Sequence, residues 1–226
     1  MLKKKKSENV LIINFKTYAE SSGKKADKLA LAANSIAKKT GKKIILVVQE
    51  TDIYRLSKLV DIPIYSEHLD PIEYGAHTGK VLAKTLKFNG AEGVLLNHSE
   101  DRFDLNEIDE STELAKKFKL KVIICATDSE QAAAVSLFKP DFVAVEPSEL
   151  IGTGISVSKS KPEIVSDSVL RVSQVSKVPL LCGAGISSGK DVRSAIDLGA
   201  KGVLVASRIV KSKKPEKIIL EMAKEL

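Results

Sequence analysis

The sequence predicts an α/β protein whose parallel strands close into a (β/α)8 barrel. Eight short runs rich in Ile, Val and Leu recur along the whole chain, and helical patterns lie between most of them. Dividing 226 residues by eight runs gives about 28 residues per run, which suits one strand and one helix. An open doubly wound sheet is the other architecture that such alternation allows, and the number of strands favours the barrel.

Each predicted strand is four or five residues long and apolar along its length, without alternation. This pattern is typical of parallel strands that are covered on both faces. In chain order the predicted strands are Val10–Ile13, Ile44–Val48, Ile62–Tyr65, Gly93–Leu96, Lys121–Cys125, Asp141–Val145, Val178–Cys182 and Gly202–Ala206.

Helices are predicted where apolar residues recur every three or four positions with polar residues between them. Asp128 and Ser129 are suitable N-cap residues for one of these helices, and Pro215 opens another. The predicted helices are Lys25–Lys39, Glu107–Phe118, Ser129–Phe138, Asp191–Leu198 and Pro215–Leu226.

The composition is that of one globular domain over residues 1–226. Apolar residues make up 43% of the chain and the mean hydropathy is −0.02, while only 4% is aromatic and Trp is absent. The core is therefore expected to consist of Ile, Val, Leu and Ala. No linker, low-complexity tract or composition shift divides the chain.

The net charge of +7 raises the question of a nucleic-acid partner. Part of this charge is local, because Lys3 to Lys6 form a run of four lysines. No recognition motif or set of stacking aromatics accompanies it, so we expect a solvated lysine-rich surface and no nucleic-acid partner. A modest positive field would help to collect an anionic substrate.

The cysteines and the hydropathy pattern predict a cytoplasmic protein. Cys125 and Cys182 each end a strongly apolar run, and we expect both to be buried free thiols in a reducing compartment. Nothing resembles a signal peptide, and no stretch approaches 18 apolar residues, so no membrane span is predicted.

Chemically versatile residues follow several of the predicted strands. In a barrel the carboxyl ends of the strands form the active-site face, so these residues should meet there. Alone, a lysine is usually solvated, a histidine can be a packing residue, and a glutamate can lie near a helix start. Together with small-residue loops, they predict an enzyme acting on a small phosphorylated compound. The residues are Asn14, Lys16, His98, Glu100, Glu146, Gly183, Gly185, Ala206 and Ser207.

Three local strings carry a resemblance to a known family. They are Asn14-Phe15-Lys16, Asn97-His98-Ser99-Glu100, and Glu146-Pro147 followed by Ile151-Gly152-Thr153-Gly154. From about Val10 to its end the chain resembles the triosephosphate isomerases, and its shortness resembles their archaeal branch. The resemblance implies a TIM barrel that interconverts dihydroxyacetone phosphate and glyceraldehyde 3-phosphate through an enediolate, without a metal or a cofactor.

The resemblance also implies roles for the residues of these strings. Glu146 would be the base that removes the carbon-bound proton, and His98 would polarise the carbonyl as a neutral imidazole. His98 lies where a helix can begin, and a helix N-terminus disfavours imidazolium. Lys16 would supply positive charge and Asn14 would hydrogen-bond near the substrate oxygens. Glu100 could pair with Lys16, either as part of the catalytic site or as a purely structural ion pair.

The phosphate would rest on backbone N–H groups after the sixth, seventh and eighth strands, where small residues permit close approach. The segment from Pro147 to about Val157 would be a lid that excludes water. The expected phosphate-binding positions are Ile151, Gly152, Gly183, Gly185, Ala206 and Ser207.

The loop Gly75–Gly79 resembles the family's interface loop, which implies a homodimer or, for the archaeal branch, a homotetramer. His68 and His77 lie near it, and packing or interface hydrogen bonds are expected for both. Arg208 departs from the Gly expected there, and would either crowd the phosphate loop or point to solvent. Ser148 departs from an expected Pro, and the string around Glu67 from one that contains Gln.

Two other functions remain open. Another phosphate-binding barrel enzyme would keep the small-residue loops after the seventh and eighth strands, but has no reason to keep Lys16, His98 and Glu146 together. A barrel that binds a sugar phosphate without turning it over would act as a sensor.

Overall fold

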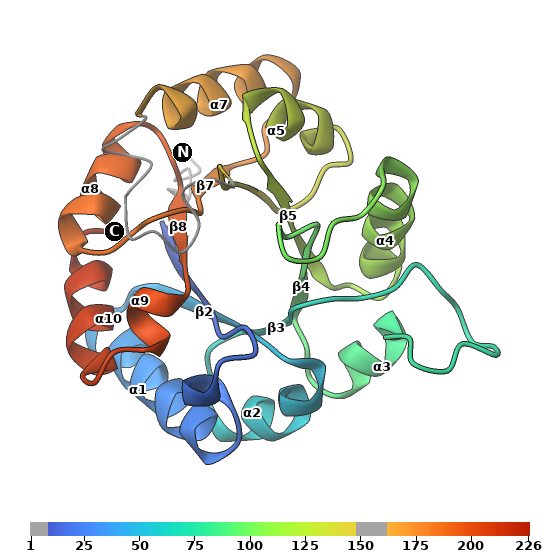
Figure 1. The fold of residues 1–226 in the computed structure, drawn as a ribbon, viewed down its shortest axis with the longest axis horizontal. Coiled ribbons are helices and arrows are strands. Elements are labelled where there is room, and N and C mark those ends of the chain that lie inside the picture. The colour runs from blue at the N-terminus through green and yellow to red at the C-terminus, as the bar shows by residue number, and fades with distance from the viewer. Residues whose placement is uncertain (1–8, 148–161) are drawn as a thin grey trace, which may run out of the picture.

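The computed structural model describes residues 9–147 and 162–226, and all eight predicted strands are present. They pair in chain order, each parallel to the next, and β8 closes the barrel against β1 (Figure 1). The predicted closed barrel is confirmed. The strands are β1 Val10–Asn14, β2 Lys43–Val48, β3 Ile64–Ser66, β4 Gly93–Leu96, β5 Lys121–Ala126, β6 Phe142–Val145, β7 Leu180–Cys182 and β8 Gly202–Val205.

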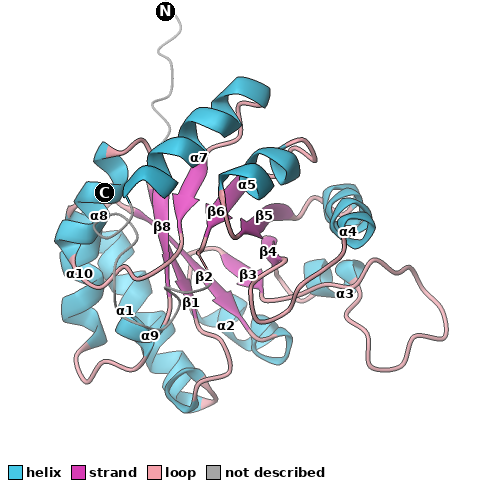
Figure 2. Ribbon diagram, turned by 45° about the horizontal axis from the view of Figure 1, so that its top comes forward, coloured by secondary structure: helices cyan, strands magenta, loops and turns pink. Residues whose placement is uncertain are grey.

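Helices surround the strands as an outer ring (Figure 2). The described helices are α1 Lys24–Thr40, α2 Ile53–Leu59, α3 Ala83–Phe88, α4 Leu105–Lys117, α5 Ser129–Ser136, α7 Pro162–Val175, α8 Gly189–Asp197, α9 Ser207–Val210 and α10 Pro215–Lys224, together with 3-10 turns at Ala19–Ser21 and Glu50–Asp52.

Two strands begin two residues later than the sequence predicted, and each has a proline at the difference. β3 starts at Ile64, after Pro63, and β7 starts at Leu180, after Pro179. Proline has no N–H for the strand ladder, so regular pairing begins beyond it. The carbonyl of Pro63 still accepts a bond from Leu46.

Four helices were not among the predicted ones: α2, α3, α7 and α9. Three of them have only four to seven residues, too few for a helical period to stand out. α7 has 14 residues but is rich in Val and Ser, which have modest helix propensity. The predicted N-cap Asp128 is confirmed, because its side chain accepts a bond from the Gln131 N–H.

The buried side chains form two groups that alternate along each strand. One group joins strand residues such as Leu11 and Ile13 to the helices, and the other consists of strand residues such as Val10 and Ile12. The second group therefore fills the barrel interior. Both cysteines are buried free thiols, as predicted; Cys125 belongs to the interior group.

Candidate active site

A cavity of about 580 Å³ opens at the carboxyl ends of the strands. It gathers side chains and small-residue loops from β1, β4, β6, β7 and β8, which are far apart in sequence and adjacent only because the barrel closes. Its lining includes Asn14, Lys16, His98, Glu100, Glu146, Gly183, Gly185, Ala206 and Ser207. Every predicted site residue within the described ranges thus lies at one cavity. Ile151, Gly152 and the rest of the predicted lid beyond Pro147 lie outside the described residues.

Two of these residues continue the inward-facing rows of their strands. Asn14 lies two positions after Ile12, and Glu146 lies two positions after Ala144; both preceding residues belong to the barrel interior. Successive inward side chains of a strand are two residues apart, so Asn14 and Glu146 form the top of the interior. Both are buried, with 4% and 3% of their surface exposed.

Lys16 is held in an unusual backbone conformation beside the cavity. Its φ is 48°, in the left-handed region, and its backbone N–H donates a 3.0 Å bond to the Asn14 side-chain oxygen. Its Nζ lies 2.9 Å from Glu100 Oε1, and its side chain is only 10% exposed. A strained backbone at a functional site persists only when its surroundings hold it, and Asn14 supplies that hold here.

The hydrogen bonds of His98 define its tautomer. The backbone N–H of Glu100 donates to Nδ1 at 3.1 Å, so Nδ1 accepts and the proton of a neutral ring lies on Nε2. Nε2 in turn lies 3.6 Å from Glu146 Oε2. A neutral His98 therefore presents an N–H donor on the side of the carboxylate.

His98 has a pKa lowered to about 4, chiefly because burial disfavours the charged ring and secondly because Lys16 repels it. The expected cause was a helix starting at His98, and that was wrong. α4 begins at Leu105 with Asp104 as its cap, and turns separate it from the strand end. The neutral form is favoured as predicted, but burial accounts for it.

Glu146 is a carboxylate in an apolar setting. Burial raises its pKa to about 7, against hydrogen bonding from the Cys125 thiol and the positive charge of Lys16. Its Oε2 has no hydrogen-bond partner within the described ranges. A buried carboxylate with a free oxygen and a near-neutral pKa is suited to taking up a proton.

Asn97 supports this arrangement from behind. Its φ of 57° interrupts the strand alternation just before His98, and its side chain donates to the Cys125 carbonyl and accepts from the Phe103 N–H. Arg102 donates to the Asn97 carbonyl. The sequence signal for this role was an Asn directly after a strand, since Asn tolerates the left-handed region.

Gly183 lines the cavity, but its N–H group is not free as expected. Its N–H donates to the Val145 carbonyl, so this amide is already used in the sheet and cannot also receive an anion. A Cβ on Gly183 would lie 2.4 Å from Cγ of Glu146 and 2.8 Å from its Oε1. Gly183 therefore leaves room for the carboxylate. The N–H groups of Gly185, Ala206 and Ser207 have no backbone acceptor within the described ranges.

Changing Gly183 to Ala should lower kcat by about a hundredfold, because the added methyl group displaces the Glu146 carboxylate by roughly an ångström. Steady-state kinetics would measure the loss. Gly41→Ala is the control: a Cβ on Gly41 meets no atom within 4 Å, and its φ of 67°, which Gly183 does not share, makes an alanine there strained. That variant should lose some stability and keep its kcat. Equal kcat values for Gly183→Ala and the wild type would contradict the contact with Glu146.

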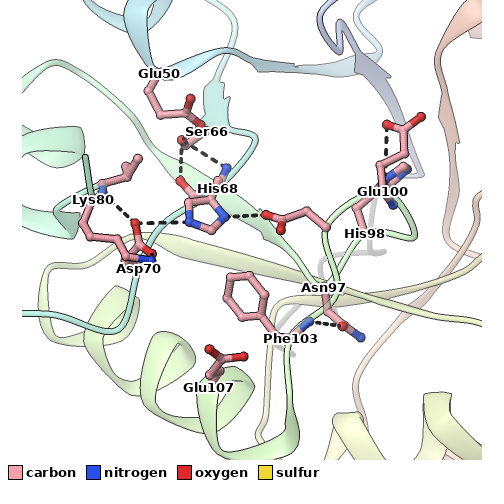
Figure 3. Close-up of polar contacts among 12 residues, drawn as sticks. Glu50, Ser66, His68, Asp70, Lys80, Asn97, His98, Glu100, Phe103 and Glu107 are labelled. Carbon is pink, nitrogen blue, oxygen red and sulfur yellow. Dashed lines mark hydrogen bonds and ion pairs between the residues drawn. The ribbon is translucent and has the colours of Figure 1, made fainter. Parts of the chain in front are cut away.

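A neighbouring hollow of about 380 Å³ lies beside the same lysine and histidine, toward β2 and β3. His68 lies here: its Nδ1 is 2.7 Å from Asp101 and its Nε2 is 3.2 Å from Asp70, which also binds Lys80 (Figure 3). The ring meets Phe103 edge-on. The expected packing of His68 is confirmed, and its described polar partners lie within the chain rather than at an interface. His77 is exposed on the loop that follows β3.

Glu67 in the same hollow is a half-buried acid. Burial and the neighbouring Glu50 raise its pKa to about 8 against the opposing effect of Lys16, and its Oε1 has no hydrogen-bond partner within the described ranges. In the unfolded chain the group ionises near its ordinary pKa of 4.5. Above that pH the unfolded state releases a proton that the folded state keeps, so stability is lost as the pH rises, until the folded group ionises near 8.

Changing Glu67 to Gln should therefore raise the free energy of unfolding at pH 8 by a few kcal/mol, because each unit of pKa shift corresponds to about 1.4 kcal/mol. At pH 4.5 the change should be small. Denaturant unfolding at both pH values would measure the difference. Glu20→Gln is the control, because Glu20 is exposed. A stability gain for Glu67→Gln that is the same at both pH values would show that ionisation is not its source.

Within residues 9–147 and 162–226, no group of three or more His, Cys, Asp or Glu side chains could hold a metal ion. Across the same ranges, every helix is too short or too polar to cross a membrane.

Comparisons with known proteins agree with this geometry. A profile of the family described as triosephosphate isomerase matches residues 9–222. A triosephosphate isomerase from Methanobrevibacter smithii is 46% identical over 218 residues, covering 96% of this chain and 98% of the relative. One from Saccharolobus solfataricus is 46% identical over 210 residues, covering 93% and 92%. A crystal structure of triosephosphate isomerase from Bartonella henselae superposes with a TM-score of 0.74, covering 96% of this chain and 97% of that one. The two sequences are only 15% identical, so this likeness supports the fold alone.

Proposed function

The chain belongs to the triosephosphate isomerase family and is an aldose–ketose isomerase of triose phosphates, and we propose that Glu146, His98 and Lys16 carry out its reaction. The substrates are dihydroxyacetone phosphate and D-glyceraldehyde 3-phosphate. The observation that carries the assignment of roles is the buried Glu146 carboxylate, with its pKa near 7, facing the Nε2 of a neutral His98.

The reaction moves one proton between two adjacent carbons. Glu146 removes it from the carbon next to the carbonyl, and the electron pair passes to the carbonyl oxygen to form the enediolate. The Nε2–H of His98 donates a hydrogen bond to that oxygen and can transfer its proton there. Glu146 returns the first proton to the neighbouring carbon. The hydroxyl on the adjacent carbon gives its proton back to His98 Nε2 and becomes the new carbonyl, which completes the exchange of aldehyde and ketone.

The remaining polar groups hold charge and position. The ammonium of Lys16 stabilises the negative charge of the enediolate and of the phosphate, and Asn14 keeps the lysine backbone in its left-handed conformation. Glu100 positions Lys16 through their ion pair. The phosphate rests on the N–H groups of Gly185, Ala206 and Ser207 and, in the lid, of Ile151 and Gly152. Gly183 makes room for Glu146.

A coupled assay of glyceraldehyde 3-phosphate conversion with a metal chelator present tests this function. Rapid turnover that the chelator leaves unchanged is the expected result, because only side chains and backbone groups take part. A folded protein that binds inorganic phosphate but turns nothing over would be a phosphate sensor. The small-residue loops would then serve binding alone.

We infer further that the enzyme is a cytoplasmic homo-oligomer, a dimer or a tetramer, with residues 1–226 as one catalytic domain. The loop between β3 and α3 projects from the barrel (Figure 1), and residues 73–80 of it are all exposed. Tyr74 in this loop is 71% exposed. An exposed aromatic on a projecting loop supports insertion into a second subunit. A monomer in sedimentation velocity at micromolar concentration would contradict this.

A further inference from the structure

The cavity contains a positive side chain that the proposed mechanism does not use. Arg208 lies in α9, directly after β8, and lines the cavity beside Gly185 and Ser207. We propose that the Arg208 guanidinium binds the phosphate of the substrate and thereby sets the preference of the enzyme for phosphorylated trioses. This proposal rests on the proposed function, because the reaction of the cavity defines which anion occupies it.

The side chain of Arg208 spans two loops. Its Nε donates a 2.8 Å hydrogen bond to the carbonyl of Ser187, in the loop that follows β7, whereas Arg208 itself follows β8. The guanidinium thus lies across the gap between the two loops whose N–H groups are proposed to hold the phosphate. Arg208 is exposed, as one of the two outcomes left open for this residue had it, but its Nε is tied to the loop after β7.

This bond fixes one edge of the guanidinium and leaves the other available. The four N–H bonds on its two Nη atoms have no acceptor within the described part of the chain. A planar guanidinium held by a backbone carbonyl has lost much of its rotational freedom before a ligand arrives. Its remaining donors match the spacing of two phosphate oxygens.

Arg208 also differs from the other two cations of the cavity. Lys16 is paired with Glu100, and the Nζ of Lys211 lies 4.1 Å from the centre of the Tyr18 ring. Among the described residues no carboxylate lies within ion-pair distance of Arg208. Neither Arg208 nor Lys211 has a described carboxylate partner, but the ammonium of Lys211 lies over the Tyr18 ring, whereas the Nη groups of Arg208 contact no described acceptor. This leaves the Arg208 charge available to an anionic ligand.

A purely structural role would be to tie the two loops together. Such a role would affect every substrate alike and would lower stability. Phosphate binding would instead affect phosphorylated ligands and spare a triose that lacks phosphate. D-Glyceraldehyde, which carries the same reacting carbons without the phosphate, separates the two roles.

The test compares the wild type with Arg208→Ala and Arg193→Ala. Arg193 is the matched control, because it is an exposed arginine on α8 that pairs with Glu225. Removing it changes the net charge equally, away from the cavity. The measurements are calorimetric binding of inorganic phosphate, and kcat/KM for glyceraldehyde 3-phosphate and for D-glyceraldehyde.

For Arg208→Ala we expect phosphate binding and kcat/KM for glyceraldehyde 3-phosphate to weaken by about tenfold to a hundredfold. The kcat/KM for D-glyceraldehyde should stay within about twofold, and Arg193→Ala should resemble the wild type. Unchanged phosphate binding would overturn the proposal. An equal loss with both substrates would also overturn it, and would assign Arg208 to loop structure.

Arg208→Lys keeps the experiment decisive if the alanine variant does not fold. Lysine retains the charge but lacks the fork, so phosphate binding should weaken by several-fold, and wild-type binding would overturn the proposed geometry. The calorimetry needs no turnover. A wild type that binds phosphate through Arg208 but has no isomerase activity would refute the proposed function and leave this inference standing.

Discussion

Replacing Glu146 by Asp should leave the barrel folded and lower kcat by about a hundredfold, because shortening the side chain by one methylene withdraws the carboxylate from the carbon-bound proton that it removes. Glu146→Gln removes the base itself and should cost up to about 10⁴-fold. The two variants differ in the cause of the loss. Aspartate keeps a base in the wrong position, whereas glutamine keeps the position without a base.

The pH dependence of kcat/KM gives a second measurement for Glu146. The base acts when ionised, and burial holds its pKa near 7, so kcat/KM of the wild type should fall about tenfold per unit below that pH. The substrate phosphate titrates in the same region, so the profile should be compared with that of a substrate phosphonate, whose ionisation differs. His98 has a pKa near 4 and should not contribute above pH 5.

A matched control for Glu146 is Glu130→Gln. Glu130 is an exposed glutamate on α5 whose side chain pairs with Arg171 on the outside of the barrel. This variant should keep wild-type kinetics, and circular dichroism should be the same for all the variants. Near-wild-type kcat for Glu146→Gln would remove Glu146 from the mechanism and would require another base for the reaction.

The strand ends explain why so much of this site could be predicted from the sequence. Asn14, His98 and Glu146 each follow a short apolar run, and a closed parallel barrel brings every such position to one face. Short sequence motifs at the strand ends could therefore predict which residues, distant in sequence, meet at the cavity. The helices were harder, because α2 and α3 are too short to show a period and α7 is rich in residues of modest helix propensity.

What could not be predicted depends on packing between strands. Gly183, after β7, leaves room for the Glu146 carboxylate after β6 because it has no side chain. The thiol of Cys125, in β5, hydrogen-bonds to the same carboxylate. No local pattern marks either residue as a neighbour of the base. The neutral state of His98 was predicted, but for the wrong reason, because its burial depends on the whole cavity and not on the nearest helix.

Replacing Lys16 by Ala should lower kcat/KM by about a hundredfold to a thousandfold, since it removes the positive charge next to the developing enediolate. Folding should change little. The partner that is left behind, Glu100, is 59% exposed and remains solvated when it loses the ion pair. Steady-state kinetics would measure the loss, with Lys25→Ala, an exposed lysine at the start of α1, as the control.

Lys16→Ala should also shift the pH profile of kcat/KM. This shift distinguishes a Lys16 that acts in the catalytic site from one that only attracts the substrate at long range. The charge of Lys16 lowers the pKa of both Glu146 and His98. Without it both pKa values rise, so the base is protonated to higher pH and the acid limb of kcat/KM should shift upward. A lysine that acted only by long-range attraction of the substrate would change KM in a salt-dependent manner and leave this limb in place.

Glu100→Gln then decides what the ion pair contributes. If Glu100 only positions Lys16, this variant should lose about tenfold or less in kcat/KM, and the double variant Lys16→Ala, Glu100→Gln should be no worse than Lys16→Ala alone. A double variant with additive losses would give Glu100 a role of its own. The backbone N–H of Glu100 sets the His98 tautomer, and the side-chain change would affect this bond only by disturbing the loop. Unfolding of Glu100→Gln at the same denaturant concentration as the wild type would argue against such a disturbance.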